Sequence, residues 1–446
     1  MKHSLIVWML LMMLHPLMAH YKAKFHVLVD TDGGPGDMRA LCMMLADPEI
    51  EVIAVTAVDG TLPADQTIRQ VRKLLQTFGH EGIPVGGTTM IQSVEMILHE
   101  VDLEEMPVDL VALGPLDNFS AAVAKRPLLH DQVRALYVIQ EENRTSTLIA
   151  GEPASMELLL KSGIPMEVVV VGKEASVNLK NFREGVVGVD SQYARATGKL
   201  SIQSSTNDYS EEVLHISEEV VPLYMKFPLQ FKIPERVPEE QIHEVRLHPG
   251  APVSRLVLEM LDGEAQDRSI VLRSFPTDSS CFETDVSAIS REIINRHGEK
   301  EWKITCLTNE FHEHLGIYSI LGAKMGLRAR EYFHVGIDEL HIESFAGSTP
   351  PLSCMNDGLQ VSTGATLGHG TISVADGAAI PSATFRFKDR QVTLTVKEEF
   401  RTRIRDEVKY GVETYGLDSE AYWEYIRALA LNYWLSYSRF EIFSIE

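Results

Sequence analysis

Three aspartates lie close together near the start of this chain. Asp30 and Asp32 follow a short apolar run at residues 25–29, and Asp37 comes after a glycine-rich bend. Several carboxylates on one short loop repel one another unless a cation or hydrogen-bond donors join them. A hard cation such as Ca²⁺, which prefers oxygen ligands, would satisfy such a loop. A turn whose aspartates cap the backbone and face water is the other interpretation, and the loop alone leaves both open.

Two predicted elements position these carboxylates. The apolar run at residues 25–29 indicates a buried strand, and residues 33–36 (Gly-Gly-Pro-Gly) cannot form regular structure. Asp37 is well placed as the N-cap or a first-turn acid of the helix that follows. The carboxylates therefore gather where a strand ends and a helix begins, which is where ligands bind in open α/β sheets.

The loop resembles the DxDPGxDD signature of nucleoside hydrolases of the inosine–uridine type. In that family the loop binds Ca²⁺, and one aspartate activates the water that attacks the anomeric carbon of ribose. The resemblance implies that Asp32 is the base and a calcium ligand, and that Asp30 and Asp37 are further ligands. Two positions depart from the motif, because Gly33 replaces the proline and Gly36 replaces an aspartate that touches ribose hydroxyls.

Later segments continue this resemblance. Residues 114–118, GPLDN, are close to the family's GPLTN segment, which implies that Leu113 gives its main-chain carbonyl to calcium. An ordinary βα turn capped by Asp117 is compatible with that role. Alignment with the family also implies a set of substrate-binding positions: Asp59, Thr61, Thr147 and His215.

A second calcium-binding aspartate of the family has no obvious counterpart. The best-matching segment is residues 214–219, where Ser217, Glu218 or Glu219 could substitute for it. His215 in the same segment is either a proton donor to the leaving base or a structural histidine. Most sugar-binding positions have changed, so a hydrolase fold that only binds a sugar or a metal is the alternative to an active enzyme.

Strands alternate with helices along the first half of the chain, which predicts an α/β fold with a doubly wound, largely parallel sheet. We expect the hydrolase-like domain at residues 22–231. Residues 232–268, with several prolines and charges, are typical of a linker followed by a helix. A second, smaller α/β (α+β) metal-binding domain is expected at residues 269–446, beginning with strands at 269–272 and 302–307 around a helix.

The second domain holds another group of metal-ligand residue types. His312 and His314 would point the same way on an extended backbone, and imidazole pairs suit zinc or a similar metal. A thiolate from Cys354 could complete the set, with Asp357 as a ligand or as an orienting group. The alternative is that the histidines cap a helix and that Cys354 is merely buried.

Residues 270–410 resemble the E-type component of formylmethanofuran dehydrogenase. His312, His314, Cys354 and Asp357 occupy matching places, and residues 362–370 match a later glycine-rich segment. Ala365 replaces a cysteine of that segment, and the family's zinc-ribbon tail is absent. The resemblance implies a metal-binding domain that uses Zn²⁺ or Fe²⁺, without fixing a reaction.

Charge and the N-terminus limit the partners. The net charge of −22 argues against a nucleic-acid polymer as a partner. Residues 1–19 have the pattern of a signal peptide, which predicts export to a bacterial periplasm and no membrane span after its removal. An aromatic stripe at residues 421–440 is typical of a core or an interface between protein chains, so a homo-oligomer is among the expectations.

Together these patterns predict an exported protein that hydrolyses the N-glycosidic bond of a nucleoside with calcium-activated water. Its expected partner is a small nucleoside or sugar. The alternative is a catalytically degenerate hydrolase fold that binds a sugar or metal, with the main metal chemistry, zinc or iron, in the C-terminal domain.

Overall fold

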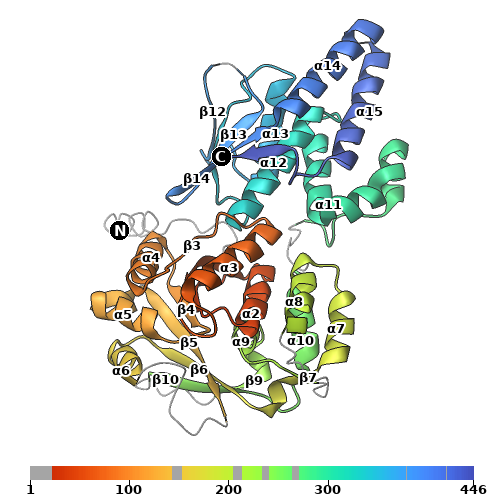
Figure 1. The fold of residues 1–446 in the computed structure, drawn as a ribbon. Coiled ribbons are helices and arrows are strands. Elements are labelled where there is room, and N and C mark those ends of the chain that lie inside the picture. Colours follow the sequence, from red (N-terminus) through yellow and green to blue (C-terminus); the bar gives the residue numbers. More distant parts are fainter. Residues whose placement is uncertain are drawn as a thin grey trace, which may run out of the picture. The chain divides into compact units, whose positions relative to one another are not determined.

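The computed structural model describes residues 23–142, 153–203, 213–233, 241–263, 271–377, 379–417 and 419–446. The chain forms two compact units (Figure 1). The first contains residues 23–276 and 331–334, and the second contains residues 277–330 and 335–446. The predicted signal peptide, residues 1–19, lies outside the described residues.

An eight-stranded sheet organises the first unit, in the order β3-β2-β1-β4-β5-β6-β10-β9. Neighbouring strands are parallel, except that β9 is antiparallel to β10. This confirms the predicted doubly wound, largely parallel sheet. Its strands are β1 (Phe25–Thr31), β2 (Ile50–Ala57), β3 (Val85–Gly86), β4 (Val108–Ala112), β5 (Val133–Glu141), β6 (Met166–Val171), β9 (Phe231–Lys232) and β10 (Ile242–Leu247).

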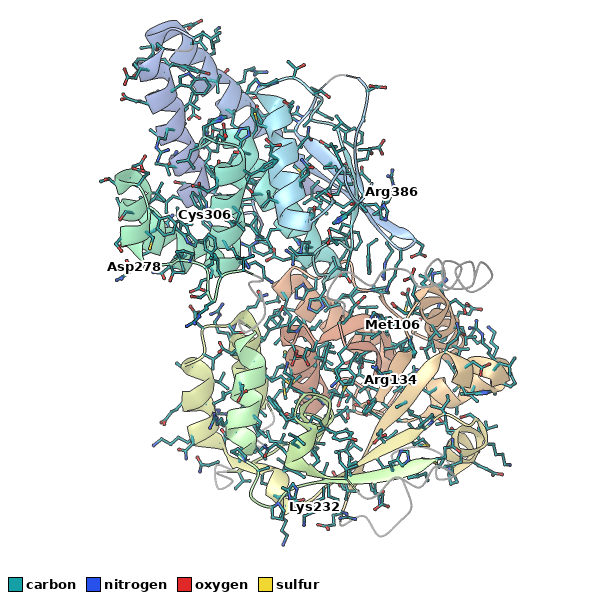
Figure 2. The ribbon with its side chains drawn as sticks, turned by 180° about the vertical axis from the view of Figure 1, so that it is seen from behind. Met106, Arg134, Lys232, Asp278, Cys306 and Arg386 are labelled. Atoms are coloured by element: carbon teal, nitrogen blue, oxygen red, sulfur yellow. The ribbon has the colours of Figure 1, made fainter. Side chains whose placement is uncertain are left out.

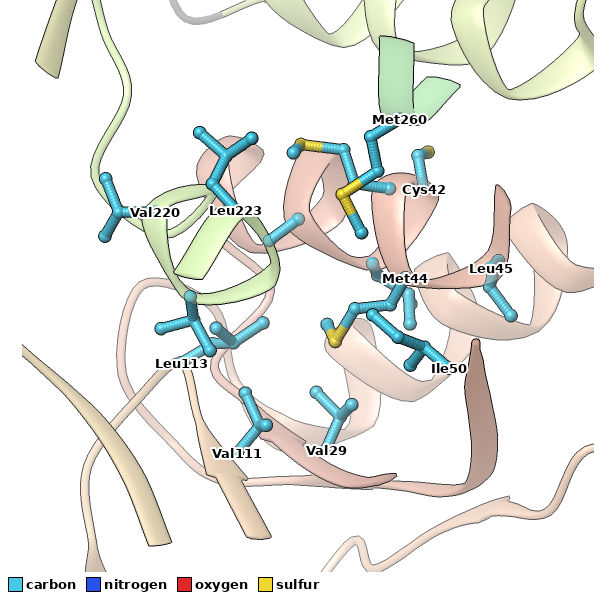
Figure 3. Packing of buried hydrophobic residues seen from close by; sticks show 14 of the residues in the cluster. Val29, Cys42, Met44, Leu45, Ile50, Val111, Leu113, Val220, Leu223 and Met260 are labelled. Carbon is cyan, nitrogen blue, oxygen red and sulfur yellow. The ribbon is translucent and has the colours of Figure 1, made fainter. Parts of the chain in front are cut away.

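Helices cover both faces of this sheet, because alternate residues of the buried strands point to opposite sides. Val27 and Val29 of β1 join one apolar cluster, whereas Leu28 between them joins another. The helices are α2 (Pro35–Ala46), α3 (Ala64–Phe78), α4 (Met90–Leu103), α5 (Asp117–Lys125), α6 (Pro153–Lys161), α7 (Leu179–Val187), α8 (Gln192–Gln203), α9 (Val220–Lys226) and α10 (Val253–Asp262), and a hairpin pairs β7 (Ser176–Asn178) with β8 (Val213–His215). Figure 3 shows part of the first cluster, with side chains of α2, α9 and α10 above those of β1 and β4.

The strand order reverses between β1 and β4. From β1 the chain proceeds outward to β2 and β3, and it then returns to place β4 on the other side of β1. Open α/β sheets bind ligands at such a switch point, outside the carboxyl ends of the strands. Those ends carry the aspartate loop, residues 30–37, and the turn of residues 113–118.

The predicted linker is wrong for residues 242–247. These residues form β10, which lies parallel to β6 inside the sheet. Its charged residues alternate with buried Val245 and Leu247, so the segment follows the period of a half-buried strand. The prolines and charges around it concealed that alternation in the sequence.

The second unit contains a smaller, five-stranded sheet in the order β12-β11-β13-β14-β15. Only the pair of β11 and β12 is parallel. Its strands are β11 (His341–Ser344), β12 (Ile372–Val374), β13 (Ser382–Phe387), β14 (Arg390–Val396) and β15 (Phe443–Ile445). Its helices are α11 (Thr284–Phe311), α12 (Ile317–Phe333), α13 (Met355–Thr363), α14 (Glu398–Tyr415) and α15 (Glu420–Ser436).

The strand expected at residues 302–307 is wrong, because these residues lie within α11. Cys306, labelled in Figure 2, belongs to this helix. Trp302 and Thr305 are buried three residues apart, which is helical spacing that the short apolar run did not reveal. Residues 271–272 form no strand either, and residues 269–270 lie outside the described part. None of the helices described is both long enough and apolar enough to cross a membrane.

Candidate functional site

Asp30 stands at the end of β1 with one carboxylate oxygen held and the other open. Its Oδ1 accepts hydrogen bonds from Thr56 Oγ1 at 2.7 Å and from Asn118 Nδ2 at 2.9 Å. Its Oδ2 is buried and has no hydrogen-bond partner within the described residues. Burial raises the pKa of Asp30 to about 7, against the lowering effect of these two bonds. An open buried carboxylate oxygen of this kind fits a cation.

Asp37 lies in the first turn of α2 and faces back over the loop. Its Oδ2 accepts hydrogen bonds from Thr31 Oγ1 at 2.5 Å and from the Asp32 backbone N–H at 3.1 Å. Burial raises its pKa well above the usual range, and the charges of Glu218 and Asp32 add to that shift. The loop therefore concentrates carboxylates whose mutual repulsion a divalent cation would relieve.

Asp32 is the half-buried member of the set, and glycines make room for it. A Cβ atom built on Gly60 would lie 2.3 Å from Asp32 Oδ2, and one on Gly114 would lie 3.0 Å from Asp32 Cβ. The Gly34 backbone N–H donates to Asp32 Oδ1 at 3.3 Å. Asp32 is thus fixed by its surroundings while remaining accessible, as a base that meets substrate must be.

The predicted turn of residues 113–118 lies beside the aspartate loop. The backbone N–H of Leu113 donates to the backbone oxygen of Asp30 at 2.9 Å. Asn118, at the other end of the turn, holds Asp30 Oδ1 and also donates to the backbone oxygen of Ala57 at 3.0 Å. The sequence prediction included Leu113 but missed Asn118 and Thr56, although Asn118 belongs to the GPLDN segment that signalled the turn.

The predicted substrate-binding residues separate in the structure. Thr61 lies beside the loop, since its Oγ1 would be 3.6 Å from a Cβ atom on Gly34. Asp59 is exposed and accepts a hydrogen bond from the Ala64 backbone N–H at 2.8 Å, at the start of α3. His215 is exposed on β8, where its Nδ1 lies 2.9 Å from Ser176 Oγ. Thr147 lies outside the described residues.

Glu218 is the acid of residues 217–219 that reaches the aspartate loop. A Cβ atom on Gly36 would lie only 1.9 Å from Glu218 Oε2. Burial, together with the charge of Glu219, raises the pKa of Glu218 to about 7. Glu219 instead accepts a hydrogen bond from Arg39 Nε on α2. Of the alternatives that the sequence left open, Glu218 is therefore the one that faces the site.

The second predicted metal site brings two histidines together by a different backbone geometry from the one expected. His312 directly follows α11, and Glu313 has a φ of 60°, so the segment is a turn with a left-handed residue and not an extended strand. The two imidazole rings nevertheless lie 4.1 Å apart. His312 Nδ1 lies 2.7 Å from Asp357 Oδ2, while its Nε2 is buried without a hydrogen-bond partner in the described part of the chain.

Asp357 therefore holds His312 and leaves Nε2 as the atom available to a metal, which is the usual arrangement around a ligating histidine. Cys354 immediately precedes α13, and burial, together with the charge of Asp357, raises its thiol pKa. In the described residues, ligand atoms of three side chains converge within 4.8 Å only at His26, Glu51 and Glu104, near the amino ends of β1 and β2. Neither the four residues predicted for the second site nor the three aspartates of the first loop form such a set.

Comparisons with known families divide the chain in the same way. The family of inosine-uridine preferring nucleoside hydrolases matches residues 27–140. The FmdE family, whose description refers to the molybdenum formylmethanofuran dehydrogenase operon, matches residues 311–443. The chain therefore joins an N-terminal domain of the inosine-uridine nucleoside hydrolase family to a C-terminal FmdE domain.

Several curated proteins are similar to the first domain. The pyrimidine-specific ribonucleoside hydrolase RihA of Citrobacter koseri is 26% identical over 212 residues, which cover 39% of this chain and 66% of that protein. The protein of the same description from Shewanella baltica is 25% identical over 181 residues, covering 32% of this chain and 57% of that protein. The chain thus spans less than two thirds of the length of these relatives.

Solved structures of nucleoside hydrolases also align with the chain. A plant nucleoside hydrolase is 17% identical, with a TM-score of 0.43, over 54% of this chain and 99% of that chain. The inosine-uridine preferring nucleoside hydrolase of Bacillus anthracis is 10% identical, with a TM-score of 0.45, over 54% of this chain and 99% of that chain.

Proposed function

We propose that the N-terminal domain hydrolyses the N-glycosidic bond of a ribonucleoside with the help of calcium. The observation that carries this proposal is the open, fully buried Oδ2 of Asp30 at the switch point of the sheet. Asp32 and Asp37 lie on the same loop, and the charge of Glu218 acts on Asp37. Their oxygens are the donor set that calcium prefers, so the residues present fit the metal that the family uses.

Each residue has a role that follows from its place. Asp30 and Asp37 would hold calcium, with the carbonyl of Leu113 as a further ligand. Bound calcium would polarise a water molecule and orient the sugar. Asp32, held between Gly60 and Gly114, takes a proton from the attacking water. The surrounding carboxylates stabilise the positive charge that develops on the sugar ring as the bond to the base breaks.

Pyrimidine ribonucleosides are the substrates that we propose first. The support is the name that the relatives share, since they are described as pyrimidine-specific ribonucleoside hydrolases. Incubation of the full chain with uridine, cytidine, inosine and adenosine, followed by measurement of released ribose, tests this choice. We expect release from the pyrimidine nucleosides that stops with a chelator and returns with calcium.

The matched variant for this assay is Asp32→Asn, which preserves size and removes the base. We expect it to reduce ribose release by about 10³-fold, within the range that a general base supplies. If neither the wild type nor the variant releases ribose while both bind calcium, the binding-protein alternative replaces the enzyme.

We also propose a transition-metal site, for zinc or iron, at His312 and His314. The specific support is the buried, unpartnered Nε2 of His312, whose other ring nitrogen is held by Asp357. The role proposed for Asp357 is orientation of the ring. Elemental analysis of the purified chain tests the site, and we expect zinc or iron in the wild type and its loss in His312→Ala.

Export is proposed on the sequence pattern of residues 1–19 alone. Intact-mass measurement of the protein purified from the native cell tests it. Cleavage near residue 19 is the expected result, and a mature chain that retains residues 1–19 would contradict export by this route.

A further inference from the structure

Gly36 and Glu218 compete for the same space. If Gly36 carried a side chain, its Cβ atom would lie 1.9 Å from Glu218 Oε2 and 2.6 Å from Glu218 Cδ. Contacts this short do not occur between real atoms, so position 36 tolerates a side chain only if Glu218 moves. The carboxylate of Glu218 thus occupies the volume into which a side chain at position 36 would project.

Packing behind Glu218 holds it in that position. Glu219, the next residue, is buried and bonded to buried Arg39, which lies three residues after Gly36 on the same helix α2. Val220 and Leu223 of α9 belong to the same buried cluster as Leu113 of the neighbouring turn (Figure 3). The ion pair therefore ties the start of α9 to α2, and the apolar cluster packs α9 with the neighbouring turn, while Glu218 is directed at the aspartate loop.

Charges of both signs act on Glu218. Arg39 bonds to Glu219, and its charge also reaches Glu218, where the charges of Glu219 and Asp32 act against it. Glu218 is half-buried as a residue, so the site is not sealed from solvent at this position. An ionised carboxylate accepts stronger hydrogen bonds from hydroxyl groups than a neutral acceptor does.

We propose that Glu218 supplies, from the segment before α9, a hydroxyl-binding carboxylate beside the aspartate loop, and that Gly36 is its obligatory partner because only glycine leaves room for it. The ligand class is a sugar with free hydroxyl groups, and this assignment of class rests on the proposed hydrolase function. The steric pairing of the two positions is independent of that function.

A double-mutant cycle tests the pairing. Gly36→Asp introduces a side chain into occupied space, so we expect its melting temperature in chelator to fall by about 5 °C or more. Glu218→Ala empties that space. In the Glu218→Ala background, Gly36→Asp should therefore lower the melting temperature by less than half as much as it does in the wild type. Gly250→Asp is the matched control, because nothing lies within 4 Å of its added Cβ atom and its effect should not depend on Glu218.

Kinetics with uridine and its 2′-deoxy and 3′-deoxy analogues test the hydroxyl-binding role. We expect Glu218→Ala to raise KM for uridine about tenfold and to affect at least one deoxy analogue much less. The double variant should regain most of the lost affinity for uridine. Equal losses on all three substrates would overturn this role while leaving the hydrolase function intact.

The two failures are distinguishable. If the changes in melting temperature caused by the two substitutions were additive, the pairing of Gly36 with Glu218 would be overturned, whatever the activity. Absence of hydrolysis by the wild type on every nucleoside would overturn the proposed function, and the hydroxyl-binding role with it, whatever the melting temperatures.

Discussion

Asp30 shows at the scale of one residue why the site needs a ligand. It is fully buried, its Oδ1 is bonded twice, and its Oδ2 has no hydrogen-bond partner in the described residues. A buried charge left in this state is costly. Thr56 and Asn118 do not neutralise Asp30, but they fix the direction in which its open oxygen points.

Asn118→Ala should therefore weaken calcium binding, although Asn118 is not itself a proposed calcium ligand. We expect calcium affinity to fall about 10–100-fold, because the bond that orients Asp30 is lost. Titration calorimetry with calcium measures this change. Asn178→Ala is the control, because Asn178 caps α7 and its loss should cost about 1 kcal/mol of stability with calcium affinity unchanged. Equal calcium affinity in Asn118→Ala and the wild type would contradict the orienting role.

Asp59→Ala distinguishes a structural role from the substrate role that the sequence predicted. Because Asp59 accepts a hydrogen bond from the first backbone N–H of α3, we expect the variant to lose about 1 kcal/mol of stability, with KM for nucleosides nearly unchanged. Urea unfolding and steady-state kinetics measure the two effects. An increase in KM of tenfold or more at unchanged stability would return Asp59 to the substrate site.

The sequence could place Asp30, Asp32, Asp37 and Leu113 because they follow strands or lie in short motifs. It could not assign Glu218 among its neighbours, since which of two adjacent acids faces the loop depends on Arg39 taking the other. Contacts of this kind join residues about 180 positions apart, and no local pattern encodes them.

At the scale of elements, the hydrophobic periodicity and the Gly- and Pro-containing turns predicted the parallel strands of the first unit well. Strand β1 includes residues 25–29, as predicted, whereas α2 begins at Pro35, within the bend that was expected to be irregular. Two errors have a common cause, because β10 and residues 302–307 of α11 are short segments whose type depends on tertiary packing. In each case the partner surface, not the local propensity, decides between strand, helix and linker.

A buried ionic cluster joins three helices of the second unit. Lys324 of α12 bonds to Glu301 of α11, and Arg439, just after α15, donates to Glu301 Oε2 at 3.0 Å. Lys324 Nζ also donates to the backbone oxygen of Trp434 at 3.1 Å. Removing one member leaves a buried charge uncompensated, so we expect Glu301→Gln to destabilise this unit by about 3–5 kcal/mol.

The same cluster gives a pH dependence. Burial acts to raise the pKa of Glu301, but the charges of Lys324 and Arg439 outweigh it and leave that pKa below the usual value. A lowered carboxyl pKa stabilises the fold above the unfolded-state pKa, and this stability is lost as pH falls through the folded-state value. Thermal unfolding should thus show acid destabilisation below about pH 4.5 that is smaller in Glu301→Gln. Glu299→Gln, at an exposed position, is the control and should behave as wild type.

At the scale of the whole molecule, the chain contains two compact units with different proposed metals. Calcium should stabilise only the unit that binds it, by about 2.7 kcal/mol at a hundredfold excess over Kd. Scanning calorimetry with and without calcium should therefore move the transition of the first unit and leave that of the second in place. An equal shift of both transitions, or a shift that survives Asp30→Asn, would contradict a calcium site at the aspartate loop.

The most direct test of the account is a calcium titration read out in one sample by melting temperature and by ribose release from uridine. If the carboxylates of residues 30–37 hold the calcium that activates the attacking water, both curves should reach half of their change at the same free calcium concentration. Both changes should be absent in Asp30→Asn. Ribose release that does not depend on calcium, or calcium stabilisation without release from any nucleoside tested, would contradict it.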